Sequence, residues 1–273
     1  MYDYGARMYM PDIGRWGIMD GKGELYLSKS PYNYASNTPV NAIDPDGNLV
    51  IFINGMQNDG TGGKPEYWRS KSGRIQFDTM VMDHFNDHNS LYRDGSYGGG
   101  KYILSNMYSD NRKYEGAIQG RKDAESIIAN LARDTTTGEI IETIKIVTHS
   151  MGGAYGKGYV RALKRYISKL PKEQQSQIKI TLVADFDPYQ GSSLKVDKDI
   201  YTQEFLHKEF GNIKGFGWLA NEQEQGISDK NTFTNTGSST DHSILTFVND
   251  ISKLQEGTYK WNGNKWICTT CNQ

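Results

Sequence analysis

The sequence is poor in several features, and each shortage narrows the range of functions. Only Cys268 and Cys271 are cysteines among 273 residues, so a disulfide-rich scaffold is not indicated, and we expect a local disulfide or a pair of thiols. The formal net charge is −1, which gives no broad basic surface for nucleic acid or anionic membrane. No apolar run approaches the ~18 residues that span a bilayer, and residues 1–20 lack the pattern of a signal peptide.

Glycine and tyrosine, in contrast, are abundant. Thirty glycines and 18 tyrosines accompany a mean hydropathy of −0.68. Because clear apolar segments are also present, this composition indicates a loop-rich, tyrosine-rich surface rather than disorder. The length has room for one large domain, or for one domain and an appendage.

The most informative stretch is 143–153, Thr-Ile-Lys-Ile-Val-Thr-His-Ser-Met-Gly-Gly. Its apolar, β-branched first half suits a buried strand, and residues 154–167 carry large side chains at helical spacing. A strand, a tight turn with one serine and a helix push the Ser150 hydroxyl out of the sheet. The next amide, that of Met151, then lies at a helix N-terminus, where anionic oxygen is stabilised.

This order resembles the G-x-S-x-G nucleophile elbow of lipases and esterases of the α/β-hydrolase type. Thr148 replaces the first glycine, at a position that packs against the following helix and needs a small residue. The resemblance implies that Ser150 is a nucleophile and that the Met151 amide belongs to an oxyanion hole. The alternative is a serine in an ordinary strand-to-helix turn.

Residues 1–47 differ in character from the rest of the chain. They contain four of the seven prolines, set between aromatic residues and turn formers, with too few apolar residues for a core of their own. Tyr-Asp-Tyr-Gly-Ala-Arg-x-Tyr at 2–9 and Asp-Pro-Asp-Gly at 44–47 occur in the order that closes an Rhs, or YD-repeat, core. The segment closely resembles that family, and the alternative is a β-hairpin extension of the domain that follows.

The resemblance implies a C-terminal fragment of an Rhs polymorphic toxin, in which 1–47 ends the shell-forming core and 48–273 is the toxin domain. In that family the Asp-Pro-x-Gly region marks the boundary, and some members are cut there by aspartates of the shell. Asp44 and Asp46 match this motif, but an upstream Asp-Pro is reduced to Met19-Asp20-Gly21. The family further implies an effector made in a bacterial cytoplasm and secreted or delivered, with an immunity protein and the Rhs shell as partners.

The second part opens with an apolar run at 49–53, which predicts a central strand that ends at Asn54-Gly55. In an α/β-hydrolase, the loop after such an early strand supplies the second N–H of the oxyanion hole. Glycine lets the backbone approach a substrate closely, so the amide of Gly55 or Met56 is the candidate donor. A strand-end turn without a functional role is the alternative.

Residues 57–100 are rich in Gly, Asp and Asn and predict a long insertion. Apolar residues at 77, 80, 81 and 85 predict a short amphipathic helix near His84 and His88. Histidines four residues apart can bind zinc, but no Glu follows the first one and no third ligand is evident. We therefore expect a solvated or lid-facing pair of histidines, and neither a metal nor a cofactor.

The remaining pattern alternates strands and helices. It predicts a strand at 101–106, a helix at 121–133, the strand that leads to Ser150, and a further strand at 178–184. This rhythm is typical of an α/β fold: a mostly parallel sheet of α/β-hydrolase type flanked by helices, here preceded by the short β-rich segment 1–47. The chain ends in a predicted hairpin around Asn262-Gly263.

Two aspartates follow the 178–184 strand, at the edge where open parallel sheets assemble their sites. A carboxylate there can orient a histidine and stabilise the imidazolium. Asp187, which lies beyond the strand and next to Pro188, is favoured over Asp185, and we expect only one of the two to serve. The alternative is a pair of turn aspartates.

The segment 189–240 is again loop-rich and predicts a cap or lid. His242 follows it, ahead of a predicted helix with apolar residues at 247, 248, 251 and 254. A histidine before the last helix matches the chain order Ser…Asp…His of α/β-hydrolases. His207 lies inside a charged stretch, so His242 is the predicted general base.

These observations together favour a serine hydrolase of lipase or esterase type that uses Ser150, His242 and Asp187. A carboxylic-ester substrate, with membrane phospholipid as one candidate, follows from the resemblance and the toxin context and not from composition. The alternative is a catalytically inactive α/β-hydrolase-like domain that binds a target or the shell. A metal-dependent hydrolase built on His84 and His88 is a third hypothesis, and the neutral charge disfavours a nuclease.

Overall fold

The computed structural model describes residues 48–57, 61–97, 108–134, 136–207, 222–235 and 242–271, together with three short strands near the N-terminus. The chain divides into two units, Met1–Asp46 and Gly47–Gln273. In the first unit, β1 (Tyr2–Asp3), β2 (Met8–Met10) and β3 (Arg15–Trp16) pair antiparallel in that order. The boundary aspartates 44 and 46, Asp20 and the predicted strand at 101–106 lie outside the described residues.

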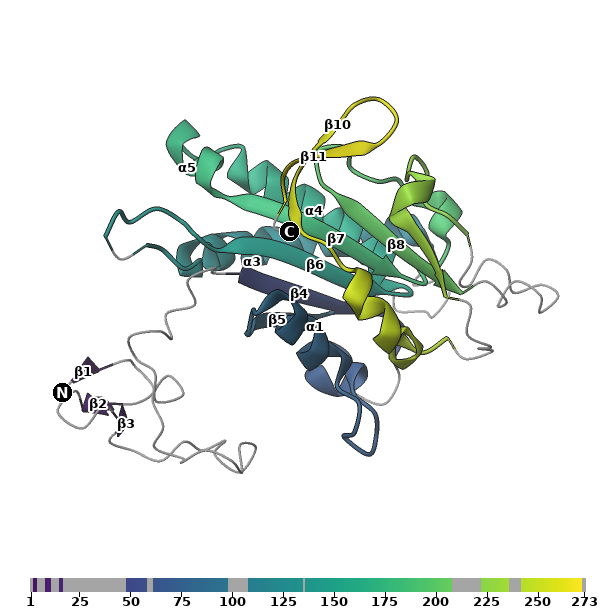
Figure 1. The fold of residues 1–273 in the computed structure, drawn as a ribbon, viewed down its shortest axis with the longest axis horizontal. Helices are drawn as coiled ribbons and strands as arrows, with labels where there is room; N and C mark the ends of the chain where they lie inside the picture. Colours follow the sequence, from purple (N-terminus) through teal and green to yellow (C-terminus); the bar gives the residue numbers. More distant parts are fainter. Residues whose placement is uncertain are drawn as a thin grey trace. The chain divides into compact units, whose positions relative to one another are not determined.

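A six-stranded sheet forms the centre of the second unit (Figure 1). Its order is β5-β4-β6-β7-β8-β9, and each neighbouring pair is parallel. The strands are β4 (Asn48–Asn54), β5 (Asn89–Asp94), β6 (Thr143–His149), β7 (Lys179–Phe186), β8 (Thr202–His207) and β9 (Thr232–Asn235). The predicted fold class, a mostly parallel sheet flanked by helices and preceded by a short β-rich segment, is confirmed.

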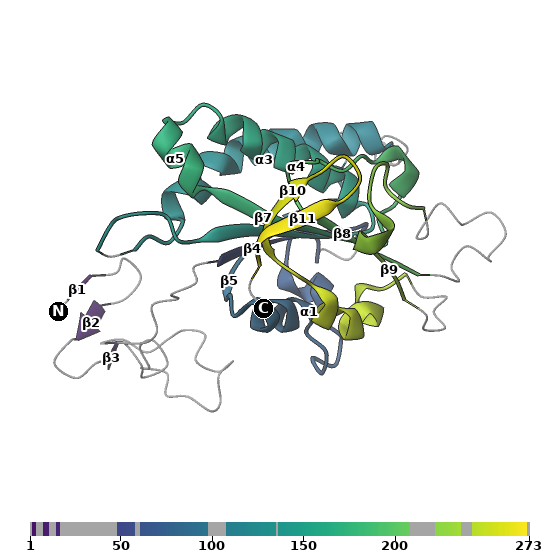
Figure 2. The same ribbon diagram turned by 45° about the horizontal axis from the view of Figure 1, so that its top comes forward.

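Helices cover both faces of this sheet (Figure 2). One face carries α3 (Ser109–Asn130), α4 (Gly152–Ile167) and α5 (Lys172–Gln177), and the other carries α1 (Phe77–Phe85) and two 3₁₀ helices, η3 (Pro65–Trp68) and η8 (Ile244–Lys253). Ile51 and Ile53 of β4 belong to the core under α3 and α4, whereas Val50 and Phe52 belong to the core under α1 and η8. Because both faces are buried, β4 is apolar from Leu49 to Ile53, whereas β6 includes the fully buried Lys145, which pairs with Glu256 at 2.6 Å.

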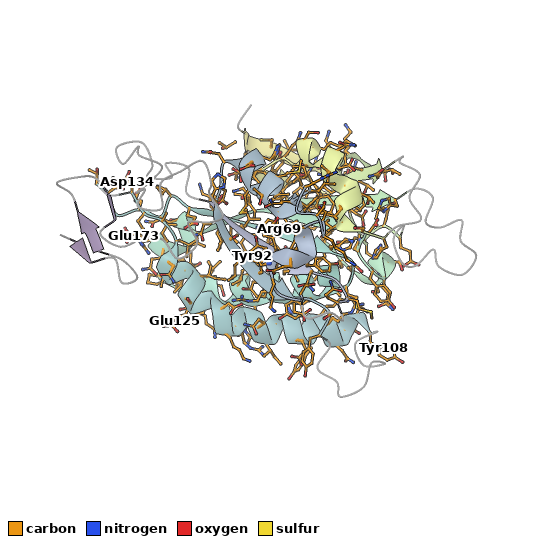
Figure 3. The ribbon with its side chains drawn as sticks, turned by 90° about the horizontal axis from the view of Figure 1, so that it is seen from below. Arg69, Tyr92, Tyr108, Glu125, Asp134 and Glu173 are labelled. Atoms are coloured by element: carbon orange, nitrogen blue, oxygen red, sulfur yellow. The ribbon has the colours of Figure 1, made fainter. Side chains whose placement is uncertain are left out.

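Close packing of α3 against α4 fixes the helix that follows Ser150. A Cβ atom on Gly116 would lie 2.0 Å from the carbonyl oxygen of Tyr155, and one on Gly158 would lie 1.8 Å from that of Lys113. Only glycine allows the two backbones to come this near. Tyr108 and Glu125 mark the run of α3 in Figure 3.

The C-terminal hairpin forms as predicted, from β10 (Gly257–Trp261) and β11 (Trp266–Cys271). Tyr259 stacks on Tyr201 with 3.7 Å between ring centroids, and Trp266 is buried beside them. Cys268 is disulfide-bonded, and the sequence holds only one other cysteine. Of the two expectations for the cysteines, the local disulfide is the one observed.

Three strands lie in segments where the sequence predicts no strand, and those predictions are corrected. β5 lies inside the expected insertion 57–100, and β8 and β9 lie inside the expected cap 189–240. These strands can carry buried polar residues because hydrogen bonds satisfy the polar side chains. Gln203 Nε2 donates to the Lys253 carbonyl at 2.9 Å, and Glu204 accepts from the Glu224 amide at 2.8 Å.

Two further findings concern the helices. The helix predicted at 121–133 is α3, which begins already at Ser109 and ends at Asn130. Within the described ranges, the structure contains no helix that combines the length and the apolar character needed to cross a bilayer.

Candidate active site

Ser150 lies at a strained turn between β6 and α4. Its φ is +55°, a left-handed conformation that residues other than glycine rarely adopt. The amide of Ser150 donates to the Phe186 carbonyl at 2.9 Å, and a Cβ atom on Gly152 would lie 2.3 Å from the Ile53 carbonyl. The turn is therefore pressed between the carboxyl ends of β4 and β7, as a nucleophile elbow requires.

The threonine that departs from the elbow motif is accommodated by the helix opposite. A Cβ atom on Gly156 would lie 2.8 Å from Thr148 Cγ2. The glycine that makes room for this close contact is therefore on α4 instead of β6. The Thr148 hydroxyl donates to the buried carboxylate of Asp185. Thr148 thus fits at this position because Gly156 lacks a side chain.

The structure brings His242 and Asp187 together beside the elbow. The Nδ1 atom of His242 lies 3.2 Å from Oδ2 of Asp187. The two rings of His242 and His149, the residue before Ser150, have centroids 5.0 Å apart. Asp187 is fully buried and also has a positive φ, +42°, so the backbone beyond β7 turns its carboxylate toward these rings.

Asp185, the reserve candidate for the acid, is occupied elsewhere. Its Oδ2 pairs with Lys157 Nζ of α4 at 2.7 Å, and the same ammonium pairs with Glu224 at 2.6 Å. Burial lowers the pKa of Lys157, but the carboxylates of Asp185 and Glu224 outweigh it and raise that pKa. The structure thus places only Asp187 next to His242. Alternation alone would put residues two apart on the same face, so the two carboxylates separate because Asp187 lies beyond the end of β7 with a positive φ.

His207 is a site residue that sequence reasoning missed. It ends β8 and is buried, its ring Nδ1 bonds Asp187 Oδ2, and its backbone amide donates to Asp187 Oδ1 at 3.0 Å. Its Nε2 lies 2.9 Å from the Thr246 hydroxyl. Both ring nitrogens are therefore engaged, and His207 holds the carboxylate that faces His242. The feature of the sequence that could have indicated this role is the position of His207 directly after the apolar pair Phe205-Leu206, which neighbouring charged residues obscure.

Gly55 lies directly against the serine, as a donor loop would. A Cβ atom on Gly55 would lie 2.6 Å from Ser150 Cβ and 2.9 Å from the Tyr67 hydroxyl. The buried Asn54 side chain fixes this loop, since it donates to the Gly55 carbonyl at 2.7 Å and accepts from the Gly63 amide at 2.7 Å. The Gly55 backbone also lowers the pKa of Tyr67, against the larger effect of burial, which raises it. Met56, the other candidate, has a side chain at the surface.

Met151 is the N-cap residue of α4, so its amide belongs to the first turn, where no helical carbonyl accepts from it. Its carbonyl accepts from Nη1 of Arg112 at 2.9 Å, and the same guanidinium donates to Gln190 Oε1 at 2.9 Å. Burial lowers the pKa of Arg112 to about 10, which leaves the group charged at neutral pH. A buried cation therefore orients the peptide next to the proposed donor.

The paired histidines of the expected insertion do not form a site together. His84 Nε2 lies 2.8 Å from the Leu254 carbonyl, and His88 is exposed near Asp83. In the described part of the chain, the donors close enough to hold a metal come from His149, Asp187 and His242, all within 4.8 Å of one another. These atoms belong to the site already described.

Electrostatics keep the ring next to the serine neutral. Burial, with smaller contributions from His242 and His207, lowers the pKa of His149 well below its usual value. A serine at a strained turn, an imidazole held by a carboxylate and the N-terminus of α4 can together activate a hydroxyl and stabilise a developing oxyanion.

Comparison with known proteins shows limited similarity. No family model matches the chain. A stretch of 53 residues is 53% identical to salivary gland surface protein 1 of Aedes aegypti, covering 19% of this chain and 2% of that protein. A solved acetylxylan esterase is similar with a TM-score of 0.37 and 10% identity over 77% of this chain and 94% of the esterase. A likeness at that level carries no argument about function.

Proposed function

We propose that the chain is a serine hydrolase of carboxylic esters, of lipase or esterase type. One observation carries this proposal: Ser150 has a positive φ at the strand–helix turn, and the His242–Asp187 pair lies beside that turn. A strained backbone conformation of this kind persists only where the surrounding structure maintains it, and such conformations are concentrated at functional sites.

Acyl transfer assigns a task to each group. His242 takes the proton of Ser150 Oγ as that oxygen attacks the ester carbonyl, and Asp187 stabilises the imidazolium that forms. The Met151 amide donates to the tetrahedral oxyanion. His242 then returns the proton to the departing alcohol, and water, activated by the same imidazole, cleaves the acyl-enzyme and restores the serine.

The biological setting is a separate proposal that rests on the resemblance of residues 1–47 to the end of an Rhs core. In that setting, residues 48–273 are the toxic C-terminal domain of a delivered bacterial effector. Membrane phospholipid is the proposed ester, and an immunity protein is the proposed partner.

The decisive experiment measures hydrolysis of short-chain and long-chain acyl esters and of phospholipid vesicles by the full chain. Wild type is compared with Ser150→Ala and His242→Ala, and Ser252→Ala serves as the matched control because its hydroxyl only caps the Asn249 carbonyl of η8. We expect both site variants to lose activity and Ser252→Ala to keep it. A fluorophosphonate probe should label wild type and Ser252→Ala but not Ser150→Ala.

Two results would overturn the proposal. A folded wild type that is inert on every ester and unlabelled by the probe would favour the inactive binding domain. Activity that persists in Ser150→Ala and disappears with a chelator would favour metal-dependent hydrolysis. The toxin setting is tested independently, by expressing wild type and Ser150→Ala in bacteria and following growth and phospholipid content, with growth arrest expected for wild type alone.

A further inference from the structure

Tyr67, which lies within the predicted insertion 57–100, places its hydroxyl at the centre of the site. Its oxygen lies 2.9 Å from where a Cβ atom of Gly55 would be, and that same Cβ position is 2.6 Å from Ser150 Cβ. The hydroxyl also bonds Nδ1 of His149. One phenol oxygen thus lies among the loop after β4, the residue before the serine and the serine itself.

This hydroxyl is held rigidly. Tyr67 belongs to η3, whose next residue, Trp68, is fully buried and packs on Phe52 with 5.2 Å between ring centroids. The residue after that, Arg69, makes a two-pronged bond to the buried Asp78 of α1, with Nη2 2.8 Å from Oδ2. Arg69 and Tyr92, which also donates to Asp78, lie near each other in Figure 3. Such anchoring suits a group that must be in place before reaction.

The hydrogen-bond pattern indicates where the phenol proton points. The Tyr67 hydroxyl and Nδ1 of His149 share one hydrogen bond. Among the described residues, Nε2 of His149 is buried without a hydrogen-bond partner. An unfilled acceptor there costs less than an orphaned N–H, so the favoured tautomer of His149 has its proton on Nδ1 and donates to Tyr67. The Tyr67 oxygen then accepts from His149, and its own proton is left for another partner.

Burial maintains both of the required protonation states. It raises the pKa of Tyr67 above its usual value, so the phenol keeps its proton, and it lowers the pKa of His149, so the ring is neutral. The phenol is consequently a neutral donor, polarised by the N–H of His149 and placed beside Ser150.

We propose that Tyr67 is a further catalytic residue, whose hydroxyl donates a hydrogen bond to the oxyanion formed when Ser150 attacks an ester. This inference rests on the proposed function. In this assignment Tyr67 supplies the second donor in place of the predicted amide of Gly55 or Met56, because its hydroxyl lies between the Gly55 loop and the elbow. The oxyanion therefore receives one donor from Met151 of the elbow and one from η3. His149 is a positioning residue that orients the phenol.

The test compares Tyr67→Phe with Tyr201→Phe in the full chain. The first variant keeps the ring that packs on Trp68 and His149 and removes only the hydroxyl. The control removes a hydroxyl from a buried tyrosine that precedes β8, at the opposite end of the strands from Ser150. For Tyr67→Phe we expect kcat on an acyl ester to fall by about 10²–10³ with little change in KM, the loss typical of one oxyanion donor. Tyr201→Phe should keep the wild-type kcat.

A second readout separates a catalytic from a structural role. An arylboronic acid forms a tetrahedral adduct with a reactive serine, and its affinity should fall in Tyr67→Phe by about the same factor as kcat/KM. A folded Tyr67→Phe with wild-type kcat and boronate affinity would overturn the inference, as would a gain in activity, which would mean that the hydroxyl obstructs the site. If wild type itself neither hydrolyses esters nor reacts with a fluorophosphonate, the proposed function fails first.

Discussion

Asp187 and His242 are 55 positions apart in the chain, yet Oδ2 of the first lies 3.2 Å from Nδ1 of the second. The same carboxylate is also bonded by the ring and the backbone amide of His207. One buried acid thus serves two histidines with different tasks. His207, whose two ring nitrogens are both engaged, fixes the carboxylate, and His242 is the histidine that faces the elbow.

The two aspartates after β7 should separate cleanly by mutation. Asp187→Asn is expected to lower kcat by about 10⁴-fold with the fold retained, because an amide cannot hold the imidazole in the required tautomer. Asp185→Asn should lower stability, since it weakens the pairing with Lys157 and Thr148, but it should preserve the activity of each folded molecule. Ester kinetics and thermal unfolding of both variants check this, and equal kinetic losses would contradict the assignment.

Removal of His207 should affect stability and catalysis together. His207→Ala leaves a cavity and deprives the buried carboxylate of a partner, at a cost of about 2–4 kcal/mol in unfolding free energy. It should also lower kcat, because Asp187 is no longer oriented. His207→Asn, which can keep a donor near the Nδ1 position, should retain more of both quantities. Urea unfolding and ester kinetics measure them, and full activity in a folded His207→Ala would refute a positioning role.

Gly55→Ala should disable the site without unfolding the chain. The added methyl group would meet Ser150 Cβ at 2.6 Å and must displace either the loop or the serine, at about 1–3 kcal/mol. We expect ester hydrolysis to be lost. Gly73→Ala is the control, because Gly73 has a positive φ and no atom within 4 Å of the added group. It should cost about 1–2 kcal/mol of strain with activity unchanged.

The buried carboxylates behind the elbow should make stability depend on pH. Burial, together with Asp185, raises the pKa of Glu204 to about 7, so the folded state keeps a proton that the unfolded chain releases near pH 4.5. The folded state then binds more protons between these values, and stability falls as pH rises from about 4.5 to about 7. Each unit of difference between the folded and unfolded pKa of Glu204 changes the free energy of unfolding by about 1.4 kcal/mol across this range.

Glu204→Gln tests this dependence, because the amide keeps an oxygen for the Glu224 N–H and cannot ionise. Urea unfolding of wild type and variant at pH 5, 6, 7 and 8 should show a shallower decline for the variant. Identical slopes would mean that Glu204 does not titrate in this range.

The sheet and the elbow could be predicted because their physics is local. β4, β6 and β7 are buried on both faces, so their sequences are rich in apolar and β-branched residues, and the turn at Ser150 is marked by adjacent glycines. β5, β8 and β9 carry polar residues, and several of these bond partners that are distant in the sequence. The pairing of Gln203 with Lys253 and Gln255, about 50 residues away, leaves no local pattern to read.

The site divides in the same way. Ser150 and the aspartates end strands, where chain order indicates a role. The part played by Tyr67 depends on a meeting with His149 across 82 residues, and that of His207 on one with Asp187 across 20. The positive φ of Asp187, which turns its carboxylate toward His242, is likewise absent from any motif. Such contacts follow from packing, which a single sequence does not specify.

The interior place of β6 determines the order in which the site would come apart on warming. Strands that are paired on both sides open only when the whole domain unfolds, whereas segments outside a sheet open at lower free energy. The serine is attached to β6, but the histidine base precedes η8 and the tyrosine belongs to η3, both outside the sheet. Heat should therefore abolish turnover while amide hydrogen exchange still reports β6 as fully protected, so that thermal inactivation precedes melting.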